Sequence, residues 1–564
     1  MPGAVYTVEN ECQDCYKCVR HCHSKAIRII DAKASVIQEA CVACGECVKV
    51  CPAHAKRIRS DSENLWRMLE NGDRLFASIA PSFVGYFRNV SIGQLADALI
   101  RAGFEGVSET AHGAQAVSSR LDSLLVKEQW PLMISSACPA VVSYVEKYHP
   151  DFARYISPVQ SPVMSHCRML REAYGNDIKT VFFGPCAAKK NESDSHSDVL
   201  SLALTFADLE QFLLKRYAPI NDRESPLALG SAAEGRFYSI EGGMNDTLRN
   251  GQRNVRFLSV SGLENLARLL QGDVSTNGRT LFIEALACHG GCVNGPAMPQ
   301  DGSVLETLFH TDSSAPIASS AGRPQGDQPH FPGVPKELAA AEVSEEEIKE
   351  ALARVGKFGK SDELNCGACG YNTCRDFAKA LLDGKAEPDM CHNYLRQNFQ
   401  KKSNALIKYI PASVVLVDGD LKICECNRNF AVLIKEEEIY QTLGNLNSLP
   451  IESCLPAFKE LFASVIGNGG EIEKYHQAFG ERIIDISVFS ITRGKCAGAV
   501  ISDVTQNEFK RERIAQQARE VIRKNVYTVQ QVARLFGEHI AETEIMLNEI
   551  AGTYEAHPGE HHEG

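Results

Sequence analysis

Residues 12–22 read CQDCYKCVRHC and residues 41–52 read CVACGECVKVCP, and these two runs decide how the chain begins to fold. Each run spaces its cysteines as C-x2-C-x2-C-x3-C, the spacing with which thiolates wrap a cubane [4Fe–4S] cluster. In such pairs the fourth cysteine of one run usually binds the other run's cluster. Because the spacing occurs twice, two zinc sites or free thiols are poor explanations. We predict a two-cluster, ferredoxin-like module over residues 1–60, with these ligands: Cys12, Cys15, Cys18, Cys22, Cys41, Cys44, Cys47 and Cys51.

The rest of the composition describes an acidic globular chain with one anomaly. Its 564 residues suggest roughly three to five domains, and its net charge of −12 speaks against nucleic acid or an anionic membrane as partner. It has no apolar run of about 20 residues and no signal peptide at its N-terminus, so we expect a cytoplasmic protein. The anomaly is the 21 cysteines, which in a reducing cytosol favour metal ligation over disulfides.

A third cysteine set follows much later, as CGACGYNTC at residues 366–374 with one more cysteine beyond it. Four thiolates suit either zinc or an iron–sulfur cluster, since both accept sulfur ligands in this number. The ferredoxin-type ligands upstream favour [4Fe–4S]. Residues 341–400 are therefore predicted to form a small iron–sulfur domain, whose first helix begins after Ser344. Its predicted ligands are Cys366, Cys369, Cys374 and Cys391.

Three further segments contain single or paired cysteines: ISSACPAVVSYVEKYHP (134–150), FFGPCAAKKNES (182–193) and EALACHGGCVNGP (284–296). In this order, behind a two-cluster module, they resemble the signature segments of [FeFe]-hydrogenases. The resemblance covers roughly the first 300 residues and implies an H-cluster domain over residues 70–307. There a cubane would be joined to a diiron subcluster that carries CO, cyanide and a bridging azadithiolate. By position, the cubane ligands are Cys138, Cys186 and Cys288, and the bridge to the diiron subcluster is Cys292.

The same resemblance implies roles for neighbouring residues. Lys189 falls where a lysine hydrogen-bonds a cyanide, which suits a cation beside an anionic ligand. Ala80, Pro81 and Ser82 fall where backbone and hydroxyl line the other cyanide, and Ser157 falls where a proton-relay serine lies. Without the resemblance, Lys189 would be interpreted as a solvated surface residue, and both serines as caps or turn residues.

The chain departs from this family's pattern around the cofactor. Ala137, expected to lie beside the cofactor, replaces a cysteine that passes protons in the fast members, and alanine has no titratable group. The other departures, in the pocket or along the acidic relay, are His112, Gln115, Val163, Gly184 and Leu286. The metal ligands therefore persist while their surroundings change, which alters a site's reactivity without removing the metal. We expect hydrogen to bind but to turn over slowly, as suits a sensor.

Beyond residue 307 the sequence predicts four more segments. Residues 308–340 are rich in Ser, Pro, Gly and Ala and are predicted to be a linker. Strand-like runs over residues 402–506 resemble a PAS domain, a generic small α+β domain being the alternative. Residues 507–554 carry heptads that favour a parallel dimer or a partner-binding helix, and a helix packed on its own domain is the alternative. The tail, residues 555–564, is predicted to be disordered.

Together these segments predict a multidomain α/β and α+β protein: a ferredoxin-like module, an H-cluster domain, a small four-cysteine cluster domain, a PAS-like domain and a C-terminal helix. The leading hypothesis is a sensory [FeFe]-hydrogenase of an anaerobic cell that splits H2 slowly and heterolytically, passes electrons along [4Fe–4S] clusters and relays their redox state through the PAS domain. Its expected partners are H2 and protons, a ferredoxin-like protein, a downstream signalling protein and a second copy of the chain. The alternatives are a metabolic ferredoxin-linked hydrogenase, a cubane-only redox sensor and an iron–sulfur assembly protein without the diiron site.

Overall fold

The computed structural model describes residues 3–127, 130–248, 254–272, 278–300, 333–336, 343–443, 446–505, 516–526 and 528. They belong to two compact units, Met1–Met390 and Cys391–Gly564. The predicted linker and heptad segment lie mostly outside the described residues, and the predicted tail lies wholly outside them; residues 516–526 of the heptad segment are helical. Throughout the described part of the chain, no helix combines the length and the apolar character needed to cross a membrane.

Two small antiparallel sheets frame the two N-terminal cysteine runs. Their strands are β1 (Val5–Thr7), paired with β4 (Lys56–Ile58), and β2 (Ile27–Ile30), paired with β3 (Lys33–Val36). Buried and exposed residues alternate along β2, as they do in an antiparallel strand with one face in water. The cysteines occupy the connections and the one-turn helices α1 (Lys17–Arg20) and α2 (Glu46–Lys49). Short strands with tight connections therefore let cysteines from both runs approach one another.

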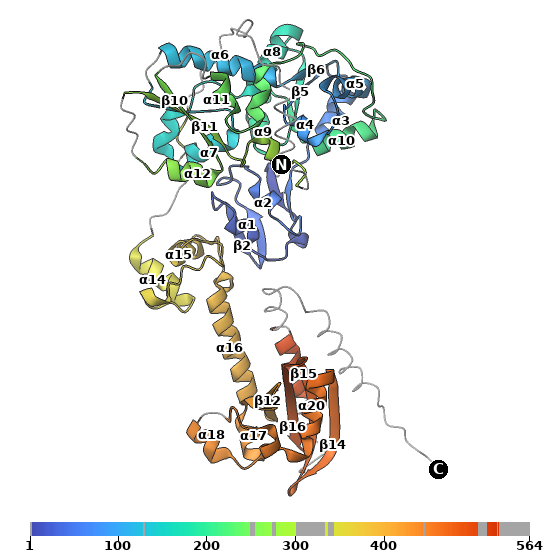
Figure 1. The fold of residues 1–564 in the computed structure, drawn as a ribbon, viewed down its shortest axis with the longest axis vertical. Helices are drawn as coiled ribbons and strands as arrows, with labels where there is room; N and C mark the ends of the chain where they lie inside the picture. Colours follow the sequence, from blue (N-terminus) through green and yellow to red (C-terminus); the bar gives the residue numbers. More distant parts are fainter. Residues whose placement is uncertain are drawn as a thin grey trace. The chain divides into compact units, whose positions relative to one another are not determined.

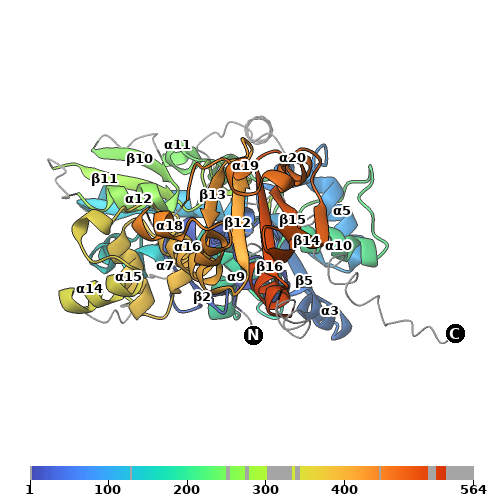
Figure 2. The same ribbon diagram turned by 90° about the horizontal axis from the view of Figure 1, so that it is seen from below.

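Two parallel sheets form the next domain, and both views place them on opposite sides of α9 (Ala188–Ser195) (Figures 1 and 2). The first sheet has the order β6-β5-β8-β9, with β5 (Leu75–Ile79), β6 (Gly106–Glu109), β8 (Lys179–Phe183) and β9 (Leu202–Leu204). The second has the order β10-β11-β7, with β7 (Leu132–Ile134), β10 (Val255–Ser261) and β11 (Thr280–Leu286). Every residue of β5 is buried, which is typical of a parallel strand covered on both faces.

Helices cover these sheets and connect their strands. They are α3 (Ser62–Glu70), α4 (Phe83–Tyr86), α5 (Ile92–Ala102), α6 (Ala111–Lys127), α7 (Pro139–Tyr148), α8 (Pro162–Tyr174), α10 (Phe206–Lys215), α11 (Gly243–Leu248) and α12 (Leu263–Leu269). Short 3-10 helices add η2 (Pro150–Tyr155), η3 (Glu234–Ser239) and η4 (Cys292–Asn294). The α/β character predicted for this part of the chain is confirmed.

The signature cysteines follow the carboxyl ends of parallel strands. Cys138 comes four residues after the end of β7, Cys186 three after β8, and Cys288 two after β11. Ser82 comes three residues after the end of β5. Since ligands of open parallel sheets bind outside the carboxyl ends of the strands, this topology directs the predicted site residues toward one region.

The small domain after residue 342 contains α14 (Glu345–Arg354), η5 (Lys360–Asp362), α15 (Cys374–Leu382) and η6 (Pro388–Met390). Ser344 caps α14 as predicted, because its hydroxyl accepts the Glu347 amide and the Glu347 carboxylate accepts the Ser344 amide. The two α-helices pack through Ile348, Leu352 and Ala378. This core is small, so the loop that carries Cys366 and Cys369 has little apolar packing of its own.

The second unit begins with a long helix and continues as a small α+β domain. The helix, α16 (His392–Tyr409), runs through residue 402, where the PAS-like domain was predicted to begin. Five antiparallel strands follow in the order β13-β12-β16-β15-β14: β12 (Ser413–Asp418), β13 (Ile423–Cys426), β14 (Glu471–Phe479), β15 (Arg482–Thr492) and β16 (Cys496–Asp503). The intervening helices are α17 (Arg428–Leu433), α18 (Glu437–Leu443), α19 (Ile451–Cys454), η7 (Pro456–Phe458) and α20 (Lys459–Asn468). The predicted strands are confirmed.

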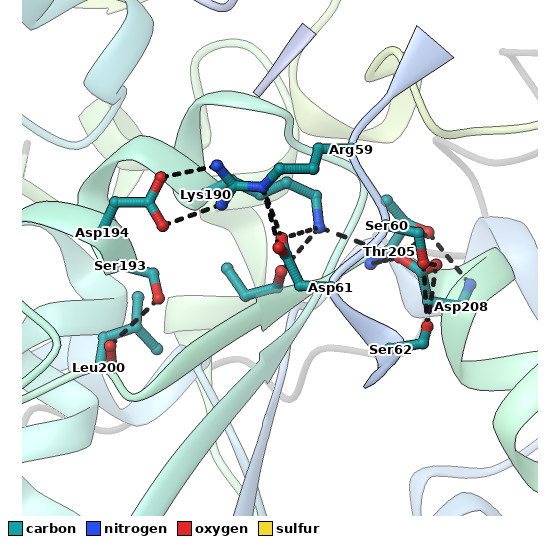
Figure 3. A network of polar contacts seen from close by, with 11 residues as sticks. Arg59, Ser60, Asp61, Ser62, Lys190, Ser193, Asp194, Leu200, Thr205 and Asp208 are labelled. Carbon is teal, nitrogen blue, oxygen red and sulfur yellow. Dashed lines mark hydrogen bonds and ion pairs between the residues drawn. The ribbon is translucent and has the colours of Figure 1, made fainter. Parts of the chain in front are cut away.

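A buried ionic network joins the N-terminal module to the parallel-sheet domain (Figure 3). The Arg59 guanidinium binds the Asp61 carboxylate at 2.9 Å and the Asp194 carboxylate through two bonds of 2.8 and 2.9 Å. The Lys190 ammonium, on α9, lies 3.2 Å from Asp61 and donates to the Ala203 carbonyl at 2.8 Å. Because Lys190 is only 1% exposed, its charge has no water to replace these partners. The network therefore fixes α9 against the segment that leaves the first module.

Asp61→Asn is expected to lower the free energy of unfolding of the full chain by about 3 kcal/mol, because it leaves two buried cations with weaker compensation. Urea unfolding followed by circular dichroism measures the loss. Glu63→Gln is the matched control: Glu63 faces Arg67 at 4.0 Å in an exposed pair, and its loss should cost at most about 0.5 kcal/mol. Equal effects of the two substitutions would contradict the role given to Asp61.

Candidate metal centres

The four signature cysteines line one cavity. Cys138, Cys186, Cys288 and Cys292 line it, and apolar residues, among them Leu286 and Pro296, complete the wall. Cys44, from the second N-terminal run, lines the same cavity. The structure thus brings together three loops from the carboxyl ends of different strands and one ligand candidate from the first module.

Charge in this cavity is poorly solvated. Burial, with a smaller contribution from the neighbouring thiolates, raises the pKa of Cys186 to about 11 and that of Cys292 to about 12. Burial also raises the pKa of Cys288 well above its ordinary value. Metal binding requires thiolates, so four such groups in one apolar space need a cationic partner to ionise together.

The arrangement fits a cluster better than a lone ion. Among the described residues, no three His, Cys, Asp or Glu side chains come close enough together to hold one metal ion. An iron–sulfur cluster spreads its thiolates around several irons, so an open cavity ringed by cysteines suits it. The cavity therefore fits the cubane that the sequence predicts.

Lys189 lies at the edge of this set. It is 8% exposed, and its ammonium donates to the Ser161 hydroxyl at 3.0 Å and the Glu192 carboxylate at 2.7 Å. Its charge lowers the pKa values of Cys186 and Cys292 against the dominant effect of burial. The alternative of a solvated surface lysine is therefore wrong. Two of its three N–H donors have protein acceptors, which leaves one for an anionic ligand.

Ser82 supplies an unsatisfied polar group. Its side chain is fully buried, and its hydroxyl has no hydrogen-bond partner among the described residues. A buried hydroxyl without a partner costs free energy, which a bound acceptor would recover. Pro81 precedes it in the turn between β5 and α4, where the Ala80 amide donates to the Phe183 carbonyl at 2.9 Å. This turn is therefore suited to contact a bound ligand that is not part of the chain.

Ser157 and Ala137, the two positions discussed for proton transfer, both contact other parts of the domain. The Ser157 amide donates to the Ile134 carbonyl at 2.7 Å, and its hydroxyl accepts the Val159 amide at 3.3 Å, as in a turn. A relay role for Ser157 stays a prediction. Ala137 packs beside an apolar cluster that includes Val159. Because this residue is alanine, position 137 supplies no acid or base for proton transfer.

His112 and Gln115 hold a neighbouring loop. A ring nitrogen of His112 lies 3.0 Å from the Gly230 carbonyl, and the Gln115 side chain accepts the Ala233 amide at 3.3 Å and donates to Glu234 at 3.4 Å. Both residues therefore hold the segment over residues 230–233, which leads into η3. These hydrogen bonds explain the positions of both side chains without any part in a proton relay.

The N-terminal cysteines form two groups that exchange their fourth members. Cys12, Cys15, Cys18 and Cys51 line one cavity. The charge of Cys22 instead acts on Cys41, Cys44 and Cys47, adding to the effect of burial in raising their pKa values. Lys56, which is 3% exposed, opposes burial at Cys18, Cys41 and Cys47 and so lies between the two groups.

The third cysteine set is distributed over loop and helix. Cys366 is exposed, Cys369 is half-buried and Cys374 is buried at the start of α15. The Cys374 amide is capped by the Asn365 side chain at 2.7 Å. Cys391 belongs to the second unit, as the N-cap of α16. Ligation by this set stays a prediction.

The sequence interpretation missed Glu284. This residue of β11 is 1% exposed, and its carboxylate accepts the amides of Met244 and Asn245 at 3.2 and 3.3 Å and the Ser259 hydroxyl at 3.2 Å. Burial raises its pKa to about 7, although these hydrogen bonds oppose the shift. Its charge also reaches Cys292. The available signal was a single glutamate inside the apolar strand run TLFIEAL.

Comparison with known proteins agrees with this architecture. Residues 73–296 match the family described as "Iron only hydrogenase large subunit, C-terminal domain". This match covers less than half of the chain. Residues 4–52 match "4Fe-4S dicluster domain", and residues 362–392 match a family model for an Fe-S cluster. The segment similar to iron-only hydrogenases thus follows a segment similar to dicluster domains and precedes one similar to a further Fe-S family.

Individual relatives are distant. "Iron hydrogenase 1" of Clostridium pasteurianum is 26% identical over 278 residues, which cover 40% of this chain and 48% of the relative. "Cytosolic Fe-S cluster assembly factor NAR1" of Encephalitozoon cuniculi is 23% identical over 189 residues, 29% of this chain and 51% of the relative. The match therefore spans about half the length of each. A solved apo [FeFe]-hydrogenase HydA1 variant from Chlamydomonas reinhardtii has a TM-score of 0.35 and 19% identity, with 43% of this chain and 84% of that chain covered.

Glu284→Gln is expected to remove a pH dependence of stability. Because the folded pKa of about 7 lies above the ordinary value of 4.5, the wild-type carboxyl binds more protons folded than unfolded between these values. Its contribution to stability is therefore full below pH 4.5 and is lost as the pH rises through 7. Urea midpoints of both proteins at intervals from pH 5 to about 8 test this. A difference between them that stays constant with pH would contradict the assignment.

Proposed function

We propose that the chain is a sensory [FeFe]-hydrogenase, which binds H2 at a diiron H-cluster, splits it slowly and heterolytically, and relays the resulting redox state. The observation that carries the proposal is the buried cavity at the strand ends, ringed by Cys138, Cys186, Cys288 and Cys292. When bound, the diiron subcluster would supply a Lewis-acidic iron that polarises H2 and a bridging amine that accepts its proton. Similarity of residues 73–296 to iron hydrogenases supports an oxidoreductase acting on H2.

The chain's own residues would hold and orient the cofactor. The cysteines bind iron, Lys189 offers its remaining N–H to an anionic ligand, and the unpaired Ser82 hydroxyl offers a second donor. The apolar wall excludes water, which strengthens these interactions. Ala137 provides no titratable group for proton exit, so slow turnover is expected.

Electrons would leave through the first module. Cys44 lines the H-cluster cavity and belongs with Cys22, Cys41 and Cys47 to the nearer N-terminal group. A cluster held there would adjoin the cavity, and Lys56 connects it electrostatically to the other group. Clusters held there would supply one-electron steps that carry charge away from the site of H2 cleavage.

The sensory part of the proposal rests on the second unit. Cys391, a predicted ligand of the third cluster, is the N-cap of α16, which ends four residues before β12 of the five-stranded domain. A change at that ligand therefore has a covalent route to the PAS-like domain. From there we propose transmission to a downstream signalling protein, with dimerisation through the PAS-like domain and C-terminal helix. A ferredoxin-like protein is the proposed redox partner.

A second candidate is an iron–sulfur assembly role without the diiron site. The similarity to the assembly factor NAR1 favours it. The remaining N–H of the buried Lys189 and the unpaired Ser82 hydroxyl favour the first candidate, because a cubane alone offers no obvious acceptor to either.

Infrared spectroscopy of the anaerobically matured protein, first under nitrogen and then under hydrogen, is the primary test. CO and cyanide stretching bands that shift on addition of H2 are the expected result. Cys292→Ser is the control, in which these bands should vanish while the N-terminal clusters keep their electron paramagnetic resonance (EPR) signals. If the wild-type protein shows no bands while a known hydrogenase matured in parallel does, the result would favour the assembly role.

Ala137→Cys is expected to raise the rate of H2 turnover about tenfold or more, because a positioned acid–base group contributes on that scale. Ala137→Ser is the size-matched control, since a hydroxyl does not titrate near neutral pH. Methyl viologen reduction under H2 measures both rates. Equal rates in the two variants would show that proton exit does not limit this site.

A further inference from the structure

The loop of the third cysteine set is seated on the first module beside Cys22. Gly370 approaches Val19 so closely that a Cβ at this glycine would lie 2.8 Å from Val19 Cγ1. Its φ of +94° also favours glycine. The Arg20 guanidinium donates to the Ala368 carbonyl at 3.3 Å and to the Cys15 carbonyl at 3.0 Å. Close backbone approach and a shared arginine therefore hold the loop against α1.

A second group of contacts holds the other end of the small domain. The Ile29 amide, on β2, donates to the Lys385 carbonyl at 3.0 Å. The Glu387 carboxylate accepts the Asp31 amide at 2.7 Å and the Ala32 amide at 3.4 Å. Two separate contact regions restrict rotation between the small domain and the module. The distance between their cysteine sets is therefore set by the fold.

Lys25 lies between the two cysteine sets. Its ammonium donates to the Gly370 carbonyl at 2.8 Å and to the Val19 carbonyl at 3.1 Å, and lies 5.7 Å from the centre of the Tyr371 ring. Burial lowers the pKa of Lys25, and the charges of Cys22 and Cys369 both oppose that effect. One cation is thus shared by a cysteine of each set.

Tyr371 presents an unused donor in the same place. It is 4% exposed, and its hydroxyl has no hydrogen-bond partner among the described residues. Burial raises its pKa, and the charges of Cys369 and Cys22 add to this. A buried hydroxyl without a partner, two residues after Cys369, is suited to donate to a cluster sulfur atom.

We propose that Cys366, Cys369 and Cys374 help to hold a redox-active iron–sulfur cluster that exchanges single electrons with the N-terminal cluster bound by Cys22, and that Lys25 is the positioning residue that couples them. In this step the N-terminal cluster is oxidised by one electron and the third cluster is reduced by one, with no bond made and no proton moved. The inference rests on the proposed function for its natural electron donor, since each H2 yields two protons and two electrons. The shared cation stabilises the added negative charge on either cluster. A zinc ion at the third set would be redox-inert.

The test uses the full chain, reconstituted anaerobically with iron and sulfide but without the diiron subcluster, and reduced with dithionite. EPR-monitored titration follows the third cluster, identified as the signal that Cys366→Ser removes. Lys25→Met is expected to lower its potential, with about a tenfold smaller ratio of reduced to oxidised cluster at a given potential, or about 59 mV. Lys25→Arg should retain the wild-type value.

Lys349→Met is the matched control, because it removes an exposed cation from α14 of the same small domain. It should leave the potential unchanged. If Lys25→Met loses iron, Lys25→Gln serves instead, since it removes the charge and keeps a donor for Gly370. An unchanged potential in the iron-replete Lys25 variant, or no signal lost in Cys366→Ser, would overturn the proposal. Because dithionite replaces H2, this result is independent of whether the diiron site forms.

Discussion

Four half-buried thiols surround the cavity at the ends of β7, β8 and β11, and each can bind metal only as a thiolate. Burial opposes ionisation, as the raised pKa values of Cys186, Cys288 and Cys292 show. Charge of this density can be held inside the domain only with a cationic group in its midst. The parallel sheets, with connections of different lengths, bring the thiols to this place. Much of the surrounding architecture compensates for their charge.

Buried and half-buried lysines provide part of that compensation, and each occupies a junction. Lys56 lies between the two N-terminal groups, Lys189 beside the signature cysteines, and Lys25 between Cys22 and Cys369. Lys190 plays a related part at a distance from the thiols, since its pairing with Asp61 fixes the helix that carries Lys189. A flexible side chain with one compact charge is well suited to such positions, because its ammonium can reach carbonyl oxygens while its stem packs among apolar atoms.

Prediction from sequence succeeded where spacing carries the information. The paired cysteine runs, the cap at Ser344 and the strands after residue 412 follow local rules of ligand spacing, capping and alternation. Prediction failed where a residue's role depends on distant partners. Glu284 gave only a weak signal, because the amides that hold it belong to α11. Lys25 gave none, because its partner loop lies more than 300 residues away.

The sequence by itself determined the spacing of the cysteines within each run, because spacing within a loop is a local property of the chain. It also determined that position 137 has no proton to exchange. Only the tertiary structure decided that Cys44 shares a cavity with Cys292, that Lys189 is buried rather than solvated, and that Ser82 has an unpaired hydroxyl. These facts depend on which strand ends and loops meet in space. Burial and the electrostatic interactions between distant residues arise only when these segments come together, so no local pattern of residues encodes them.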